Sequence, residues 1–143
     1  MSNPMKLIAQ SEEDLAVIST LLQDTAVRIG DIAWLPADQR FAFVGNRYRW
    51  EKKKMFRKPK GERIRTAFHL NGITAAQLHG LNLSDSDTVL DLLNIEAHET
   101  EKGYSLLLNF SGGAAIRLQT EAIDAIATDL SESWEAIARP SHD

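Results

Sequence analysis

The stretch that decides the fold is residues 104–118, YSLLLNFSGGAAIRL, in which two apolar runs flank a Ser-Gly-Gly connection. Apolar alternation on both sides of a short glycine-containing loop is typical of a β-hairpin. A two-residue loop would place Leu108 opposite Arg117 or Ala115, whereas a three-residue loop keeps the apolar side chains together. The three-residue loop therefore predicts these pairs: Phe110 with Ala114, Leu108 with Ile116, and Leu106 with Leu118.

Two more hairpins are predicted on the N-terminal side of this one. A strand over residues 88–97 is followed by a turn at residues 99–103, which leads into the strand described above. Residues 63–70 alternate between apolar and polar, and Asn71-Gly72 follows them. That dipeptide indicates a two-residue hairpin, because a type I′ turn needs positive φ twice. We expect it to return the chain as a paired strand to about His79.

Two glycines interrupt the apolar alternation in the first half of the chain. The apolar positions change phase past Gly30, and they do so again past Gly45. Such a change predicts a β-bulge at each glycine. Beyond the second bulge, Arg47 and Arg49 are expected to point to solvent.

A helix is predicted near each end of the chain. After a short strand over residues 6–9, Ser11 and Asp14 occupy the N-cap and N3 positions of a capping box, and apolar residues follow at helical spacing. The second helix covers about residues 120–137. Its apolar face consists of Ile123, Ile126, Leu130, Trp134 and Ile137.

Together these elements predict an α+β fold in a single domain over residues 1–143. About seven mostly antiparallel strands form a small barrel or sandwich, because so many hairpins do not easily stay flat. The C-terminal helix would cap one open end. This element order resembles the pleckstrin-homology-like barrel, and the resemblance implies no site residues.

The composition excludes several classes of protein. There is no cysteine, which excludes disulfides, thiolate metal sites and a cysteine nucleophile. No apolar run approaches the roughly 20 residues that span a bilayer, and the first residues lack the features of a signal peptide. We therefore expect a cytoplasmic protein.

Positive charge is concentrated in one segment of an acidic protein. The chain has a net charge of −4, yet ten of its sixteen basic residues lie between Arg47 and Arg65, against two acidic ones. That segment carries +8 and the rest of the chain −12. Charge separation of this kind bears on association rather than on fold. The segment is predicted to be a hairpin projecting from the body, with these candidate anion- or partner-binding residues: Arg47, Arg49, Lys52, Lys53, Lys54, Met55, Phe56, Arg57, Lys58, Lys60, Arg63 and Arg65.

Several longer motifs, taken together, resemble a known family. They include Arg28-Ile29-Gly30-Asp31-Ile32-Ala33-Trp34-Leu35-Pro36, Asn46-Arg47-Tyr48-Arg49-Trp50-Glu51, and Gly112-Gly113-Ala114-Ala115-Ile116-Arg117-Leu118. Nearly end to end, the chain is similar to domain-of-unknown-function family 2948, which is bacterial and common in alphaproteobacteria. The resemblance implies a bacterial cytosolic protein and supplies no activity or ligand.

Sequence patterns for catalysis or metal binding are weak. In the predicted Asn71-Gly72 hairpin, His69 and His79 would point to opposite faces of the sheet. His98 shares a strand face with Glu96, but such pairs are common by chance. The acidic clusters lie among polar residues, which do not separate carboxylate pKa values. We therefore expect no metal, no cofactor and no catalytic residue.

Three functional hypotheses follow. The leading one is a small non-enzymatic binding or adaptor domain that recognises a protein, either at the basic segment or in the groove between a sheet edge and the C-terminal helix, by strand addition. The alternative is binding of RNA or another polyanion through residues 47–65. The third is an enzyme with a pocket inside the barrel. The oligomeric state is left open.

Overall fold

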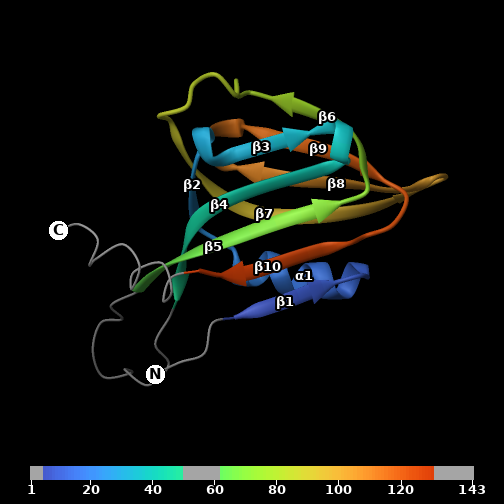
Figure 1. The fold of residues 1–143 in the computed structure, drawn as a ribbon, viewed down its shortest axis with the longest axis horizontal. Helices are drawn as coiled ribbons and strands as arrows, with labels where there is room; N and C mark the ends of the chain where they lie inside the picture. Colours follow the sequence, from blue (N-terminus) through green and yellow to red (C-terminus); the bar gives the residue numbers. More distant parts are fainter. Residues whose placement is uncertain (1–4, 50–61, 131–143) are drawn as a thin grey trace.

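The computed structural model describes residues 5–49 and 62–130, which form one α-helix, ten β-strands and three short 3-10 turns (Figure 1). The elements in chain order are β1 (Lys6–Ala9), α1 (Glu12–Leu21), β2 (Thr25–Arg28), β3 (Ile32–Leu35), β4 (Arg40–Arg49), β5 (Glu62–Asn71), β6 (Ile73–His79), β7 (Val89–Thr100), β8 (Gly103–Phe110), β9 (Ala115–Thr120) and β10 (Ala125–Asp129).

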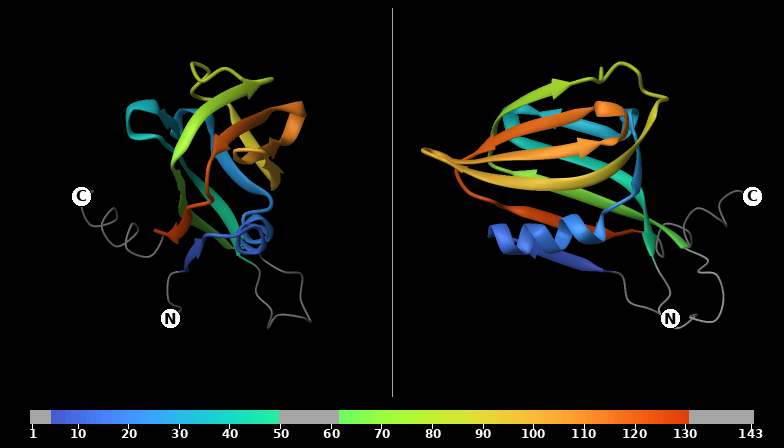
Figure 2. Two further views of the ribbon diagram at one scale, coloured as in Figure 1. Left: turned by 90° about the vertical axis from the view of Figure 1, so that its right-hand side faces the viewer. Right: turned by 180° about the vertical axis from the view of Figure 1, so that it is seen from behind.

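The strands form one antiparallel sheet in the order β1-β10-β5-β4-β2-β7-β8-β9-β6, with β3 pairing with β4 beside this path. The sheet curls strongly but stays open, and β1 and β6 are its two ends (Figures 1 and 2). A mostly antiparallel sheet with an N-terminal helix fits the predicted class. The prediction of a small barrel or sandwich of about seven strands is wrong, because ten strands share one sheet and no hydrogen bonds join its ends.

The two C-terminal hairpins are confirmed. Strands β7 and β8 pair down to Thr100 and Gly103, so Glu101 and Lys102 form the turn. The next hairpin, β8–β9, has the predicted register, with Leu106 opposite Leu118 and Leu108 opposite Ile116. The amide of Phe110 also donates to the carbonyl of Ala114 at 2.8 Å.

The N-terminal helix begins as predicted and joins two distant strands. The hydroxyl of Ser11 accepts a hydrogen bond from the amide of Asp14 at 3.1 Å, which satisfies one free N–H of the first turn. The helix packs against β1 and β7 (Figure 2). Where the β7–β8 register shifts between Leu92 and Asn94, the amide of Ile95 donates instead to Ser19 Oγ at 2.8 Å.

The predicted hairpin at Asn71-Gly72 is wrong. The strand that follows has about the expected bounds, but β6 pairs with β9 rather than with β5. Gly72 has the positive φ of 76° that the dipeptide predicts, and here it turns the chain around a corner. The amide of Ile73 then donates to the carbonyl of Gln39 at 2.9 Å. A local turn signal does not determine which strand the next segment will pair with.

The two predicted β-bulges are also wrong. At Gly30 the chain forms a 3-10 turn over Ile29–Asp31 and divides into two strands, β2 and β3. At Gly45 strand β4 continues, and its register with β5 is unbroken. A side chain at Gly45 would lie 2.7 Å from Thr25 Cγ2 and 2.8 Å from the carbonyl oxygen of Ala26. Glycine therefore allows β2 to approach closely rather than marking a bulge.

The predicted helix over residues 120–137 is contradicted in its first half. Thr120 ends β9, and β10 follows as a strand between β1 and β5. Every second side chain of β10 is buried, namely Ala125, Ala127 and Asp129. This period of two is hard to see in the sequence, because the buried residues are small or charged rather than large and apolar. Residues 131–137, including Trp134 and Ile137, lie outside the described residues.

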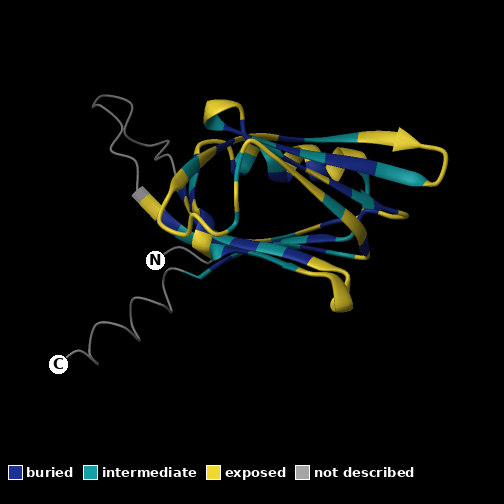
Figure 3. Ribbon diagram, turned by 90° about the horizontal axis from the view of Figure 1, so that it is seen from above, coloured by how far each residue is buried: buried dark blue, intermediate teal, exposed yellow. Residues whose placement is uncertain are grey.

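The core occupies the concave side of the curled sheet. Buried and exposed residues alternate along most strands (Figure 3). The largest fully buried side chains include Phe41, Phe43, Phe68 and Phe110. Phe43 and Phe68 are in contact, with ring centroids 5.3 Å apart. These side chains belong to the hydrophobic core of the protein.

Candidate functional site

Arg47, a candidate partner-binding residue, is buried, so its predicted outward orientation is wrong. It forms two parallel hydrogen bonds with Asp129, Nε to Oδ1 and Nη2 to Oδ2, each 2.9 Å long. Because β4 has no bulge, position 47 lies on the same face as Phe41 and Phe43. Arg47 therefore holds the fold together and presents no charge to a partner.

Asp129 is the centre of this buried cluster. Its carboxylate also accepts from Thr66 Oγ1 at 2.8 Å and from the amide of Met5 at 2.9 Å. Burial alone raises the pKa of Asp129, but the hydrogen bonds from Arg47, Met5 and Thr66 and the charge of Arg47 together hold that pKa below its usual value. The cluster joins β4, β5 and β10 to the residue that precedes β1.

Arg63 and Arg65 do point outward, as predicted. The guanidinium of Arg63 lies 4.4 Å from the centre of the Tyr48 ring, and its Nη1 donates to the carbonyl of Asn46 at 2.9 Å. Arg65 is half-exposed, and its Nη2 lies 3.9 Å from Asp31 Oδ2. A binding role for either stays a prediction. The side chain of Arg49 and the whole of Lys52, Lys53, Lys54, Met55, Phe56, Arg57, Lys58 and Lys60 lie outside the described residues.

The free edge of β6 is a feature that the sequence reasoning did not locate. This strand ends the sheet and, within the described ranges, pairs only with β9 (Figure 2). From Thr66 to Ser84 the chain has no Asp, Glu, Lys, Arg or Pro. Exposed sheet edges usually carry such residues because they prevent pairing with other chains. The absence of charged residues and proline was the sequence signal for this edge. The predicted hairpin with β5 concealed it, because that hairpin gives β6 a different neighbouring strand.

A groove of about 670 Å³ lies beside this edge. It is lined by Gln77, Leu78 and His79 of β6, Leu107 of β8, and Ala115 and Arg117 of β9. The register sets Gln77 opposite Arg117 and His79 opposite Ala115, so these four share one face of the sheet. The small side chain of Ala115 leaves the hollow between its larger neighbours.

Arg117 is an exposed cation in this groove. Its Nη1 donates to Ser105 Oγ at 3.1 Å, which holds the guanidinium against the outer face of the sheet. Among residues 5–49 and 62–130, no carboxylate forms an ion pair with it. Within these ranges the groove therefore offers a positive charge without an ion-pair partner, beside the free edge of β6.

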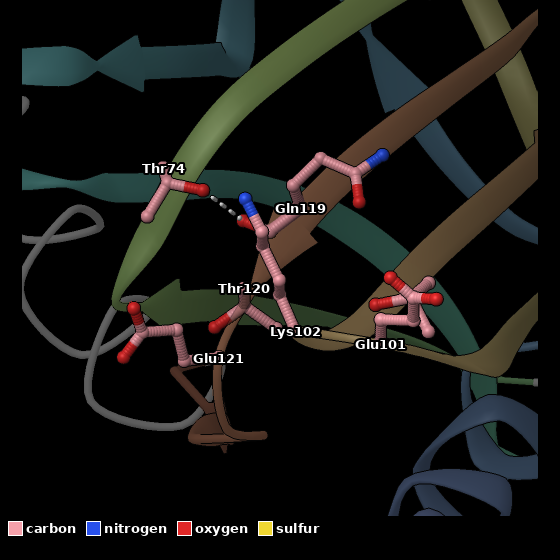
Figure 4. A pocket seen from close by; sticks show the side chains of 7 residues that line it. Thr74, Glu101, Lys102, Gln119, Thr120 and Glu121 are labelled. Atoms are coloured by element: carbon pink, nitrogen blue, oxygen red, sulfur yellow. Dashed lines mark hydrogen bonds between the residues drawn. The ribbon is translucent and has the colours of Figure 1, made fainter.

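A second cleft, of about 450 Å³, opens at the other end of β6 (Figure 4). Two of its hydroxyl groups already have protein partners: Thr74 Oγ1 donates to the carbonyl of Gln119 at 3.2 Å, and Thr120 Oγ1 contacts the carbonyls of Gly72 and Ala122 at 3.0 and 2.7 Å. The carboxylates of Glu101 and Glu121 also line it, and the buried hydroxyl of Thr120 beside them is engaged by backbone carbonyls. This arrangement supports no catalytic assignment.

The histidines form no metal site in the part of the chain that the structure describes. The predicted orientation of His69 and His79 toward opposite faces depends on a β5–β6 hairpin, but β6 pairs with β9 instead. His98 and Glu96 do share a strand face, and His98 Nε2 lies 2.9 Å from Glu96 Oε1. Glu96 Oε2 also accepts from Asn109 Nδ2 at 3.1 Å. This is an exposed polar cluster on β7 and β8.

Comparison with known proteins identifies the family. The family model described as "Protein of unknown function (DUF2948)" matches residues 5–142, so the chain belongs to that family and the resemblance seen in the sequence is confirmed. No curated protein and no solved structure matches the chain. In the described ranges, no helix is long and apolar enough to cross a bilayer.

Proposed function

We propose that this member of the DUF2948 family is a protein-binding module that accepts an extended segment of a partner along the free edge of β6. The observation that carries the proposal is the edge itself: β6 contains no Asp, Glu, Lys, Arg or Pro, and past Ile73, whose amide donates to Gln39, its outer side has no strand partner in the described ranges. The outward N–H and C=O groups of such a strand are a template for another strand.

Side chains along β6 favour a strand rather than a helix as the partner element. Ala76 and Leu78 lie opposite Leu118 and Ile116, whose side chains are buried, so they continue the apolar inner face of the sheet to its edge. Leu78 remains 40% exposed there. An added strand would place apolar side chains next to these two and cover them, while its backbone completes the ladder.

Site-specific photocrosslinking tests the proposal. A photoreactive amino acid replaces Leu78 in the full chain, expressed in cells of its natural source, and the matched control replaces Ile8, which is 56% exposed on β1. We expect a protein adduct at position 78 and none at position 8, mapping to one extended segment of the partner. That segment, as a synthetic peptide, should slow hydrogen exchange in β6. No adduct at position 78, or protection that leaves β6 unchanged, would overturn the proposal.

A second candidate is binding of RNA or another polyanion through residues 47–65. The concentrated charge and the exposed Arg63 favour it, although Arg47 is neutralised by Asp129. Fluorescence anisotropy with single-stranded RNA at two salt concentrations tests it. Affinity should fall with salt and with the triple change Lys52→Gln, Lys53→Gln, Lys54→Gln, but not with Lys102→Gln. RNA that stays unbound at low salt rules this candidate out.

A further inference from the structure

We infer that the segment accepted by β6 carries an acidic side chain, of glutamate length, on the outer face of the sheet, where it meets Arg117. The inference rests on the proposed function and deepens it by naming the chemistry of the partner. It depends on the register of β6 with β9, on the groove beside them and on the charge of one residue.

The register determines which side chains of an added strand would enter the groove. Side chains of neighbouring strands at paired positions lie on the same face of a sheet. Gln77 and His79 share their face with Arg117 and Ala115. An added residue next to Gln77 or His79 therefore faces the groove, and the residues before and after it lie beside Ala76 and Leu78.

Distance selects the length of the acidic side chain. Adjacent strands lie about 4.8 Å apart, so an added strand would lie about 10 Å from β9, with β6 between them. Arginine and glutamate side chains together span that distance across the hollow above Ala115, and aspartate is shorter by one methylene group. In the free protein, Arg117 Nη1 donates to Ser105 Oγ on β8, the strand on the other side of β9, so the guanidinium leaves that hydroxyl and turns toward β6 when it pairs with the acid.

The positive charge of Arg117 favours a different protein as the partner, rather than a second copy of this chain. Antiparallel pairing of two β6 strands would bring no carboxylate to the interface, since Ile73–His79 contains none. Arg117 of both copies would then stay without a counter-charge. A partner segment in which apolar residues alternate with glutamate satisfies both the apolar inner side of the edge and the cationic outer side.

Two matched peptides test the inference on the full chain. The probes are capped heptapeptides, Thr-Val-Glu-Val-Glu-Val-Thr and its counterpart with both glutamates replaced by glutamine, and their length matches that of β6. We expect the glutamate peptide to bind about two- to fivefold more tightly, as a partly exposed ion pair allows. Arg117→Gln should abolish this preference, and Arg28→Gln, which removes the same charge on β2, should retain it. Hydrogen exchange of residues 73–79 reports whether either peptide lies on the edge.

The possible outcomes distinguish a failure of the acidic preference from a failure of strand addition at β6. Equal affinity of the two peptides, with protection of β6 by both, overturns the acidic preference and leaves strand addition supported. A glutamate preference that survives Arg117→Gln also overturns it. Binding of the glutamate peptide with no protection of β6, or no binding by either peptide, counts against the edge itself and so against the proposed function.

Discussion

The two ends of the sheet differ in how they are protected. Strand β1 has four residues, begins with Lys6 and lies against α1, and the amide of Met5 just before it is bound by Asp129. Strand β6 has seven residues, carries no charge, and has a groove beside it. Proteins usually shorten, charge or cover the edges of their sheets to avoid pairing with other chains. The contrast supports the proposal that β6 accepts another strand, whereas β1 has features that oppose such pairing.

The largest loss of stability is expected at the Arg47–Asp129 cluster, which holds the β1 end of the sheet. Asp129→Ala leaves Arg47 buried without a counter-charge, so we expect the free energy of unfolding to fall by about 3 to 5 kcal/mol. Urea denaturation measures the loss, and hydrogen exchange should show β1 opening more readily than β6. Arg47→Met combined with Asp129→Leu is the control, because it leaves no charge buried and should recover much of the loss. A loss smaller than about 0.5 kcal/mol, the size typical of a surface change, would contradict this account of the cluster.

Low pH should reduce the stability that Asp129 gives to the β1 end of the sheet. The folded state lowers the pKa of Asp129 from 3.8, so its contribution to stability is complete above that value and is lost as the pH falls through the lower folded pKa. Stability measured by urea denaturation between pH 5 and 2 should therefore decline less steeply in Asp129→Asn than in the natural chain. The same slope in both proteins would show that Asp129 is not the group responsible.

The helix that flanks β1 gives a smaller effect. Ser11→Ala removes the N-cap of α1 and should cost about 1 kcal/mol. Thr20→Ala is the matched control, because its hydroxyl only donates to the carbonyl of Ala16 on an exposed turn. Hydrogen exchange should speed up in α1 and β1 with little change in β6. Equal acceleration at both ends would mean that α1 does not protect β1 selectively.

The smallest effect on stability is expected at β6, where the effect on binding is largest. Leu78→Lys places a charge on a side chain that is already 40% exposed, so the free energy of unfolding should change by about 0.5 kcal/mol or less. Binding of the glutamate peptide should nevertheless be lost, since a lysine on the edge opposes strand addition. Ile8→Lys on β1 should leave peptide binding intact. If both variants bind alike, the two edges do not differ in the way proposed.

Prediction from the sequence succeeded where contacts are local. The Ser11 cap and the β8–β9 register depend on residues a few positions apart, and both agree with the structure. The orientation of Arg47 failed because its partner, Asp129, is 82 residues away and nothing near Arg47 indicates it. The edge at β6 was missed for a similar reason, since Asn71-Gly72 is compatible with either a hairpin or a corner.

By itself the sequence determined the individual strands of the C-terminal hairpins, the start of α1, the absence of thiol chemistry and the segregation of charge. These follow from short-range periodicity and from composition, which do not depend on the rest of the fold. Only the tertiary structure decided which strands are neighbours, that Arg47 is buried with Asp129, and that β6 ends the sheet. Strand pairing is non-local, because each strand can satisfy its backbone hydrogen bonds with any partner of suitable register, and the choice depends on packing the whole core at once.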